Sequence, residues 1–352
     1  MADEIELKLA VSHRYADLFA QEITKFRILD QQTRFLANTY FDTADRYFAR
    51  HKMGLRVRRE RQLFTLTLKT DGNVVGGLHI RPEYNVTLDS ARPDLTKLTR
   101  FDGLRLPLDL HLQPVFSTDF ERTFWLVECG CNSEVEIALD RGVIKAGDKS
   151  EEICEVEFEL KRGELHELLT LVAELSLTDG VRLSSASKAE RGYRLADAAP
   201  TKTTDWLAKW REILALENQG AKSRQISTAL FRYEQQLIEE TVALGADYFA
   251  RDFLRTVECI GAFFNLYHYY NENPKLLADT LAEKQQNSDQ TADEQTITEL
   301  AESNQRLLEI MKEIIRFHTE SKDNHQSMRK LLETLHLRQY ANRMIDFIRL
   351  TL

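Results

Sequence analysis

The stretch Glu4-Ile5-Glu6-Leu7-Lys8 decides the fold, because charged and apolar residues alternate along it one by one. The side chains of a β-strand point alternately to its two faces, so Glu4, Glu6 and Lys8 share one face while Ile5 and Leu7 share the other. The stretch therefore predicts a strand with one apolar face and one face that holds charges of both signs.

The same alternation recurs down the first half of the chain and predicts an antiparallel sheet. The predicted strands are Glu4–Val11, Phe35–Asp42, Gly54–Glu60, Leu63–Thr70, Gly77–Leu88, Ser117–Val127, Glu134–Arg141 and Ile153–Lys161. Turn-forming residues such as Asp71-Gly72-Asn73 separate several of them. Two stretches with helical spacing, Ser12–Phe26 and Gly163–Leu177, are expected to cover the apolar side of the sheet, with Ser12 as an N-cap.

After Pro200 the strand pattern ends and a helical period replaces it, which places a domain boundary near residue 200. Residues 1–200 form the predicted sheet domain and residues 201–352 a helical domain. The polar stretch Glu283–Asp293 shows no periodicity and is predicted to be a loop. The predicted helices are Thr204–Glu217, Ser223–Ala243, Asp247–Asn271, Pro274–Leu281, Glu294–Thr319, Lys322–Leu335 and Leu337–Leu350.

The charged side of the predicted strands contains both cations and carboxylates. An ordinary antiparallel sheet exposes one face to solvent, and a solvent-exposed polar face is enough to explain the charges of any single strand. Its repetition over seven strands favours a sheet closed on itself, with the charged face inside. The cations are Lys8, Arg56, Arg58, Lys69, Arg81 and Arg122, and the carboxylates are Glu4, Glu6, Glu155, Glu157, Glu159 and Asp140.

Each sign of charge on this face suits one part of a metal–phosphate complex. Guanidinium and ammonium groups form charge-assisted hydrogen bonds to phosphate oxygens. Carboxylates repel phosphate, but they are the oxygen ligands of Mg²⁺ or Mn²⁺, which also bind substrate phosphates. The combination predicts a site for a triphosphate with a divalent metal ion.

Several segments resemble the CYTH family, the triphosphate tunnel metalloenzymes, over about residues 2–197. The resemblance rests on the ExExK motif at Glu4–Lys8, the RVRRE and LTLK strands and the late EVEFEL strand. Within that family, bacterial inorganic triphosphatases with a CHAD-like helical region are similar in further segments. These are GGLHIRPEYNV (Gly76–Val86), VFSTDFER (Val115–Arg122), Val135–Gly147 and SKAERGYRLA (Ser187–Ala196).

The resemblance implies an α+β fold: a closed eight-stranded antiparallel β-barrel with covering helices, followed by an all-α bundle. It implies metal-dependent hydrolysis of inorganic triphosphate to pyrophosphate and phosphate, with Glu4, Glu6 and Lys8 as catalytic residues. The implied metal ligands, for Mg²⁺ or Mn²⁺, are Glu4, Glu6, Glu155, Glu157, Glu159 and Asp140. The implied substrate-binding residues are Lys8, Arg56, Arg58, Lys69, Arg81, Arg122 and Lys188.

Other functions remain open at this stage. The family also includes thiamine triphosphatases and class IV adenylate cyclases, so another triphosphate is an alternative substrate. A protein that binds triphosphate or polyphosphate without turnover is a second alternative, although burying many carboxylates without a metal would be costly. The helical region departs from a CHAD-like domain, since its 19 Lys+Arg and 23 Asp+Glu give a net charge of −4 rather than a basic surface.

The composition of the chain limits its expected cellular compartment and its expected partners. The net charge of −9 argues against general nucleic-acid binding. Cys129, Cys131, Cys154 and Cys259 are too few for a disulfide framework, which fits a reducing, cytoplasmic compartment. The chain lacks a basic signal-peptide start, and no apolar run approaches the roughly 18 residues of a membrane span. We therefore expect a cytoplasmic protein without membrane or nucleic-acid partners, whose oligomeric state the sequence does not indicate.

Overall fold

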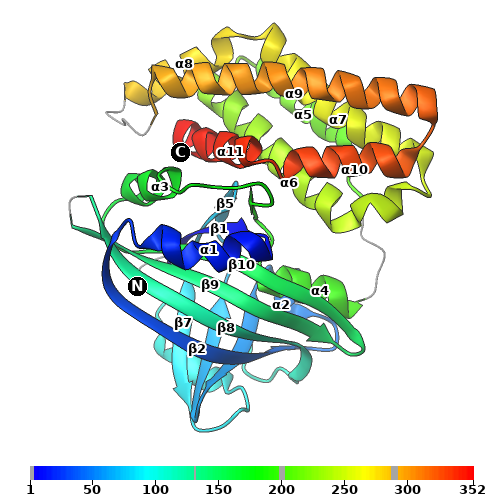
Figure 1. Cartoon of the computed structure of the whole chain (residues 1–352). Helices are drawn as coiled ribbons and strands as arrows, with labels where there is room; N and C mark the ends of the chain where they lie inside the picture. The colour runs from blue at the N-terminus through cyan, green and yellow to red at the C-terminus, as the bar shows by residue number, and fades with distance from the viewer. Residues whose placement is uncertain (1–3, 131, 198–202, 287–291) are drawn as a thin grey trace. The chain divides into compact units, whose positions relative to one another are not determined.

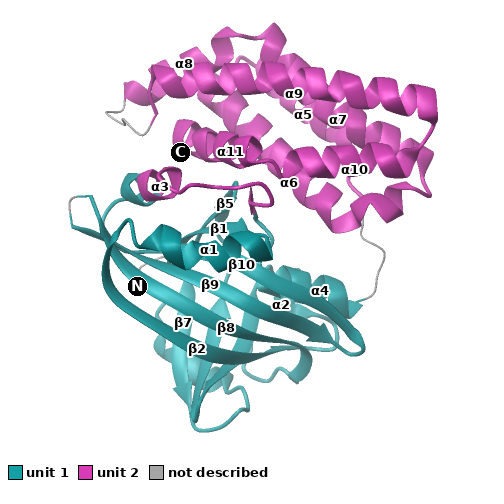
Figure 2. Cartoon of the chain, in the orientation of Figure 1, with its two compact units in different colours: residues 1–168, 184–200 teal, residues 169–183, 201–352 magenta. Residues whose placement is uncertain are grey.

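A computed structural model describes residues 4–130, 132–197, 203–286 and 292–352. The chain divides into two compact units, one of residues 1–168 and 184–200 and one of residues 169–183 and 201–352 (Figure 2). The predicted boundary near residue 200 lies outside the described residues, as do Cys131 and part of the predicted loop Glu283–Asp293. The assignment of residues 1–200 and 201–352 to separate domains stays a prediction.

The first unit is built on a curled antiparallel sheet (Figure 1) with the strand order β5-β6-β1-β10-β9-β8-β2-β3-β4-β7. Each of the eight predicted strands is present, although β2 begins earlier than predicted and the predicted strand Gly77–Leu88 is divided in two. The strands are β1 (Glu4–Ala10), β2 (Arg27–Asp42), β3 (Gly54–Glu60), β4 (Leu63–Lys69), β5 (Asn73–Val75), β6 (Leu78–Arg81), β7 (Glu83–Leu88), β8 (Gln113–Cys129), β9 (Ser133–Ala146) and β10 (Lys149–Arg162).

Pro82 divides the predicted strand Gly77–Leu88. Proline has no N–H to donate to a ladder, so a strand is interrupted where it occurs. Before it, β6 pairs with β1, with Arg81 opposite Glu4. After it, β7 pairs with β4, with Glu83 opposite Lys69. The two halves of one predicted strand therefore pair with different neighbours.

Helix α1 (His13–Ile23) covers part of the apolar face of the sheet. Ser12 is its N-cap, as predicted, and the Ser12 hydroxyl accepts a backbone hydrogen bond from the first turn. Phe19 packs against Trp125 of β8 and Phe158 of β10, with ring centroids 5.9 Å and 6.3 Å apart. These edge-to-face contacts anchor the helix on strands whose opposite face is charged.

A second apolar layer covers β3, β4 and β7. It includes side chains from α2 (Tyr47–Arg50) and from the 3₁₀ helix η1 (Leu95–Arg100). The buried members are Phe48, Leu55, Val57, Leu66, Leu68, Tyr84, Val86, Leu88, Leu95 and Leu98. Because the β3 members alternate with Arg56 and Arg58, both arginines must lie on the other face of the strand. We call this other face of the sheet the charged face.

Helix α4 (Lys188–Asp197) packs on the charged face, in a stretch where the sequence predicted no helix. Its Tyr193 ring lies 5.1 Å from Phe116 of β8, edge to face. Tyr193 belongs to an apolar cluster that includes Phe120, two residues before Arg122 on the same strand. One end of the charged face is therefore covered by apolar side chains, and the first residue of α4 lies at their border with the charges.

In residues 203–286 and 292–352, the second unit has seven helices, and each overlaps a predicted one: α5 (Trp206–Asn218), α6 (Ser223–Phe249), α7 (Phe253–Glu272), α8 (Lys275–Gln285), α9 (Glu294–Ser321), α10 (Asn324–Leu335) and α11 (Arg338–Thr351). Helix α6 consists of two helical segments, because Gly245, two residues after the predicted end at Ala243, has non-helical dihedral angles of φ 69° and ψ 167°. Helix α3 (Leu165–Ala173) is shorter than predicted, and β11 (Arg182–Leu183) was not predicted.

A buried ion pair lies in the core of the helical bundle. Arg343 of α11 donates to Glu234 of α6 at 2.6 Å, and both side chains are at most 1% exposed. Tyr267 and Tyr340 donate to the same carboxylate oxygen, and Asn304 accepts from the guanidinium. Hydrogen bonds of this kind are what makes a buried pair tolerable in a low-dielectric core.

None of the helices in the described part of the chain combines the length and the apolar character that a membrane span requires.

Gly142 and Gly261 offer a matched pair of substitutions. A Cβ on Gly142 of β9 would lie 2.2 Å from the carbonyl oxygen of Asp119 and 2.5 Å from the Cα of Phe120, whereas a Cβ on Gly261 of α7 would meet nothing within 4 Å. We expect Gly142→Ala to lower the free energy of unfolding by about 1–3 kcal/mol through overpacking. Gly261→Ala should raise it by about 0.5–1 kcal/mol, because alanine favours the helix.

Urea unfolding of the two variants beside the wild-type protein measures both effects. A Gly142→Ala variant as stable as the wild type would contradict the close approach of β8 and β9 at this point.

Candidate functional site

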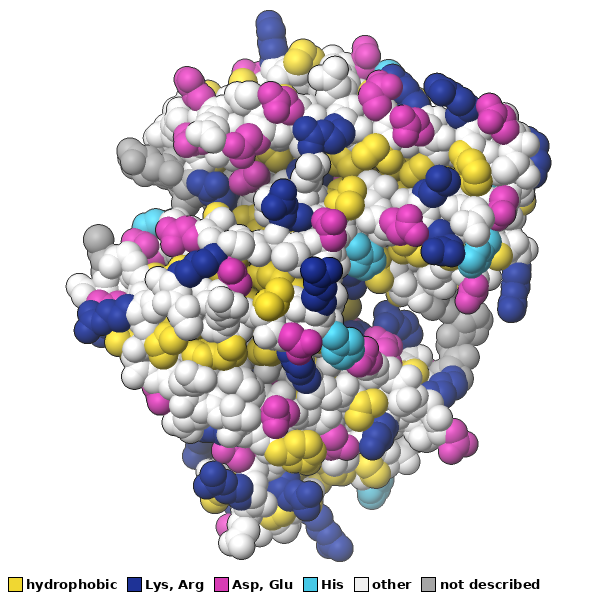
Figure 3. All heavy atoms as spheres, in the orientation of Figure 1, with side chains coloured by type: hydrophobic (Ala, Val, Ile, Leu, Met, Phe, Trp, Pro, Cys, Tyr) yellow, Lys and Arg dark blue, Asp and Glu magenta, His cyan; other side chains and the backbone are white. Residues whose placement is uncertain are grey.

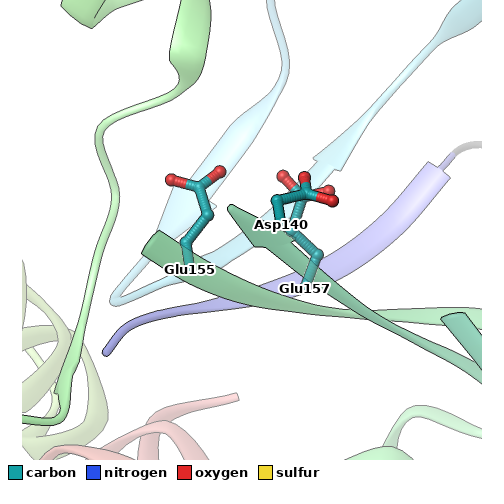
Figure 4. A group of neighbouring side chains, drawn as sticks. All are labelled: Asp140, Glu155 and Glu157. Carbon is teal, nitrogen blue, oxygen red and sulfur yellow. The ribbon is translucent and has the colours of Figure 1, made fainter. Parts of the chain in front are cut away.

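Three carboxylates gather on the charged face, and we call them the acidic trio: Asp140 of β9 with Glu155 and Glu157 of β10. One oxygen atom from each lies within 4.8 Å of the others. Figure 4 shows the three side chains pointing to the same side of their strands. Asp140 is fully buried and Glu155 is 2% exposed. Carboxylates buried so closely together require positive charge beside them.

Lys188 and Arg122 provide most of that charge. Lys188 Nζ lies 2.7 Å from Asp140 and 2.9 Å from Glu157, and it also contacts Glu155. Arg122 donates to both oxygens of Asp140, each at 2.7 Å, in a bidentate pair. Burial by itself raises the pKa of Glu157, but Lys188 and Arg122 hold that pKa well below its usual range. Glu157 is therefore ionised at neutral pH.

A second group of charges links β1 with β4, β6 and β7. Lys69 Nζ lies 2.6 Å from Glu4 and 2.8 Å from Glu83, and Arg81 lies 2.8 Å from Glu6. Burial raises the pKa of Glu4 to about 7, although Lys69 acts in the opposite direction. This group contains three carboxylates and two cations, and the raised pKa leaves Glu4 only partly ionised at neutral pH.

Lys8 lies between the two groups. It stands opposite Glu157 in the pairing of β1 with β10, and its Nζ lies 3.8 Å from both Glu155 and Glu157. Its Nζ also donates to the backbone oxygen of Ala186 at 3.3 Å. Lys8 is 1% exposed, so the ammonium group is held inside the protein at a fixed place.

Three arginines gather positive charge on the same face, and we call them the guanidinium cluster: Arg56 and Arg58 of β3 and Arg122 of β8. Burial, and then the charges of Arg56 and Arg122, lower the pKa of Arg58 to about 9. Arg58 Nε donates to the side-chain oxygen of Asn38 at 2.9 Å, while the buried Nε of Arg56 has no hydrogen-bond partner. Partly buried guanidinium groups that repel one another, with a donor left over, are arranged to receive an anion.

Sequence reasoning missed three side chains of this face. Asn38 and Tyr40 of β2 are buried, and Tyr40 pairs across the strands with Arg56. Their alternation with Thr39 and Phe41 is a readable signal, but neither is a charged residue type, so the charge pattern of the strands does not mark them. His79 of β6 is 2% exposed. Burial, and then Lys8 and Arg81, lower the pKa of His79 to about 3, so its ring is neutral.

The structure divides the six predicted metal ligands. Asp140, Glu155 and Glu157 come together as the acidic trio, whereas Glu4 and Glu6 lie with Lys69 and Arg81. Glu159 lies 2.7 Å from Lys161 and is 27% exposed. Lys188, predicted to bind substrate, contacts the acidic trio. All the predicted cations of the strands lie on the charged face.

The acidic trio fits a divalent cation. Its donors are all carboxylate oxygens, which hard cations such as Mg²⁺ and Mn²⁺ prefer. Their mutual separations, up to 4.8 Å, are close to the span of the ligands around one such ion. The fit requires Lys188 to withdraw, because its ammonium group now occupies the centre of the trio.

A curled antiparallel sheet with this charged face has the chemistry to bind a metal ion and a small polyanion. The chain belongs to the CYTH family: the model of the CYTH domain matches residues 2–193. It is 44% identical to an inorganic triphosphatase of Haemophilus influenzae over 354 residues, which cover 100% of this chain and 98% of that relative.

Two solved structures are similar to part of the chain. A putative adenylyl cyclase from Hippeastrum, described as having a dominant triphosphatase activity, is 20% identical, with 48% of this chain and 84% of that chain covered and a TM-score of 0.36. A protein of Pyrococcus horikoshii is 19% identical, with 53% and 97% covered and a TM-score of 0.35. These scores are low, so the family assignment rests on the first two comparisons.

Adding Mg²⁺ or Mn²⁺ should stabilise the protein, by about 2.7 kcal/mol at a concentration 100 times the dissociation constant. Glu157→Gln removes one charged ligand of the acidic trio and should abolish most of the rise in melting temperature. Glu159→Gln, on the same strand, should retain the rise because its carboxylate pairs with Lys161.

Calorimetry of the three proteins with metal and with chelator measures the shift. If Glu159→Gln loses the rise in melting temperature and Glu157→Gln keeps it, the ion binds outside the acidic trio.

Proposed function

We propose that the chain hydrolyses inorganic triphosphate to pyrophosphate and phosphate with a divalent metal ion, Mg²⁺ or Mn²⁺. The observation that supports it best is the conjunction of a guanidinium cluster and the acidic trio on one buried face. The inorganic triphosphatase of Haemophilus influenzae, 44% identical over the whole chain, supports the same reaction. Phosphoryl transfer needs mainly positioning and charge stabilisation, which this face provides without a protein nucleophile.

We also propose that the sheet closes into an eight-stranded tunnel. Only Pro82 separates β6, which pairs with β1, from β7, which pairs with β4. If residues 78–88 act as one strand, they join the two ends of the order β1-β10-β9-β8-β2-β3-β4. The 2.6 Å contact between Lys69 of β4 and Glu4 of β1 supports this closure, since it bridges the joining strand. A closed tunnel would enclose the charged face.

In this proposal the cations of the charged face bind the phosphate chain, and the acidic trio holds the metal ion. When bound, the ion neutralises charge on the phosphate oxygens and lowers the pKa of a coordinated water. Arg56 and Arg58 stabilise the charge that develops on the terminal phosphoryl group. The oxygen of a water forms a bond to the terminal phosphorus, the bond to the bridging oxygen breaks, and pyrophosphate leaves. A carboxylate of the charged face accepts the proton of the water.

The remaining assignments are proposals of the same kind. We assign catalysis to residues 1–200 and regard residues 201–352 as a degenerate CHAD-like bundle with a structural role. The visible face of its helices mixes side chains of both signs (Figure 3), which does not suggest a polyphosphate groove. Cys154 and Cys259 are free thiols, consistent with a reducing cytoplasm.

The first test is phosphate release by the purified protein from inorganic triphosphate, with Mg²⁺, Mn²⁺ or chelator, beside ATP and thiamine triphosphate. We expect metal-dependent release that is fastest with inorganic triphosphate. A class IV cyclase would instead convert ATP to cyclic AMP and pyrophosphate. Tight triphosphate binding without turnover of any substrate would overturn the proposal and favour a binding protein.

Arg58 and Arg59 provide a matched pair for the anion site. Arg58 lies in the guanidinium cluster, whereas its neighbour Arg59 is exposed on the opposite face of β3. Arg58→Ala should lower kcat/KM for inorganic triphosphate by about 10²- to 10³-fold, the usual effect of losing a preorganised donor. Arg59→Ala should leave it unchanged. Equal effects of the two substitutions would show that the cluster does not bind the reacting phosphate.

A further inference from the structure

His79 points onto the charged face in the middle of the second group of charges. It stands opposite Glu6 in the pairing of β6 with β1, and residues opposite each other in a sheet project to the same side. Arg81, two residues further along β6, shares that side and donates to Glu6 at 2.8 Å. The imidazole is therefore aimed at the place where the cations of the proposed phosphate site converge.

Neither ring nitrogen of His79 has a hydrogen-bond partner, although the side chain is only 2% exposed. Buried polar groups are almost always hydrogen-bonded, and an orphaned one costs stability. The other buried histidine of the described chain, His318, follows the rule, with its Nε2 2.8 Å from the side-chain oxygen of Asn324. His79 is thus an exception that requires an explanation.

Packing does not explain the exception, because the charged neighbours of the ring are Lys8, Arg81, Glu6 and Lys69. The three cations cannot accept a hydrogen bond from the ring. Glu6 could accept one, but its carboxylate makes no hydrogen bond to the ring and accepts instead from Arg81, through Oε1. The surroundings therefore lack one component, a hydrogen-bond acceptor that several cations attract. A phosphate oxygen has these properties.

We propose that His79 is a further substrate-binding residue, whose ring N–H donates a hydrogen bond to a phosphate oxygen of inorganic triphosphate. This role rests on the proposed function and adds to it a directional contact. The lysines and arginines attract any polyanion, whereas a single imidazole N–H selects an oxygen atom at one position. Its other ring nitrogen is free to accept a hydrogen bond from Lys8 or Arg81 once the substrate is bound.

The proposal predicts opposite effects on stability and on binding. His79→Leu removes a buried polar group without a partner, so the melting temperature of the free protein should stay the same or rise. The same change should weaken the binding of inorganic triphosphate, measured by calorimetry in the presence of chelator, by about 10- to 100-fold, the usual effect of losing a hydrogen bond to a charged group. His79→Gln, which keeps a donor, should recover part of the affinity.

The matched control is His111→Gln, at an exposed histidine outside the described site, which should bind as the wild type does. A His79→Leu variant that binds triphosphate within twofold of the wild type overturns the role of His79. So does a lowered melting temperature with unchanged affinity, which would indicate a structural role. If the wild-type protein neither binds nor hydrolyses triphosphate, the proposed function itself fails.

A second measurement does not depend on the folding of His79→Leu. In wild-type protein labelled with ¹⁵N at its nine histidines, triphosphate should shift the ring signals of one buried histidine. His79→Gln should remove that signal. Ring signals of His79 that stay unchanged at saturating triphosphate would overturn the proposal.

Discussion

The structure of the first unit depends on the mutual compensation of charges buried on one face of a sheet. Lys69 lies 2.6 Å from Glu4 and 2.8 Å from Glu83, and Lys188 contacts all three members of the acidic trio. A buried charge without its partner is strongly destabilising, so each of these side chains limits what its neighbours can be. The alternation of EIELK and the later strands therefore reflects a requirement for pairing across strands as well as for burial.

The cations of the charged face neutralise the buried carboxylates, which allows the sheet to fold, but they could pair with other anions instead. A bound polyanion would draw Arg122, Lys188 and Lys8 toward its own oxygens and leave the acidic trio short of positive charge. A divalent cation would then replace the charge that the trio had lost. Binding of the anion and binding of the metal are thus expected to reinforce each other, and such coupling is reciprocal by thermodynamic necessity.

Much of this arrangement could be predicted from the sequence. The period of two identified every long strand and the face of each charge, because a strand leaves its side chains no other choice. Register was not predictable: nothing in the sequence shows that Glu157 stands opposite Lys8 or that Glu6 stands opposite His79. The division of the six carboxylates follows from register, as does the burial of the histidine. The first half of β2 was missed because its exposed residues show no alternation.

Two buried charged networks in the chain show how a structural cluster differs from a functional one. In the helical bundle Arg343 faces a single carboxylate, Glu234, to which two tyrosine hydroxyls also donate, so opposite charges meet one to one. On the charged face, cations gather beside other cations, and Arg58 has a lowered pKa from burial and from its arginine neighbours. Folding alone gives no reason to bring like charges together, because each contact between them costs free energy. Their assembly is explained if the protein was selected to bind an anion that is not part of the chain.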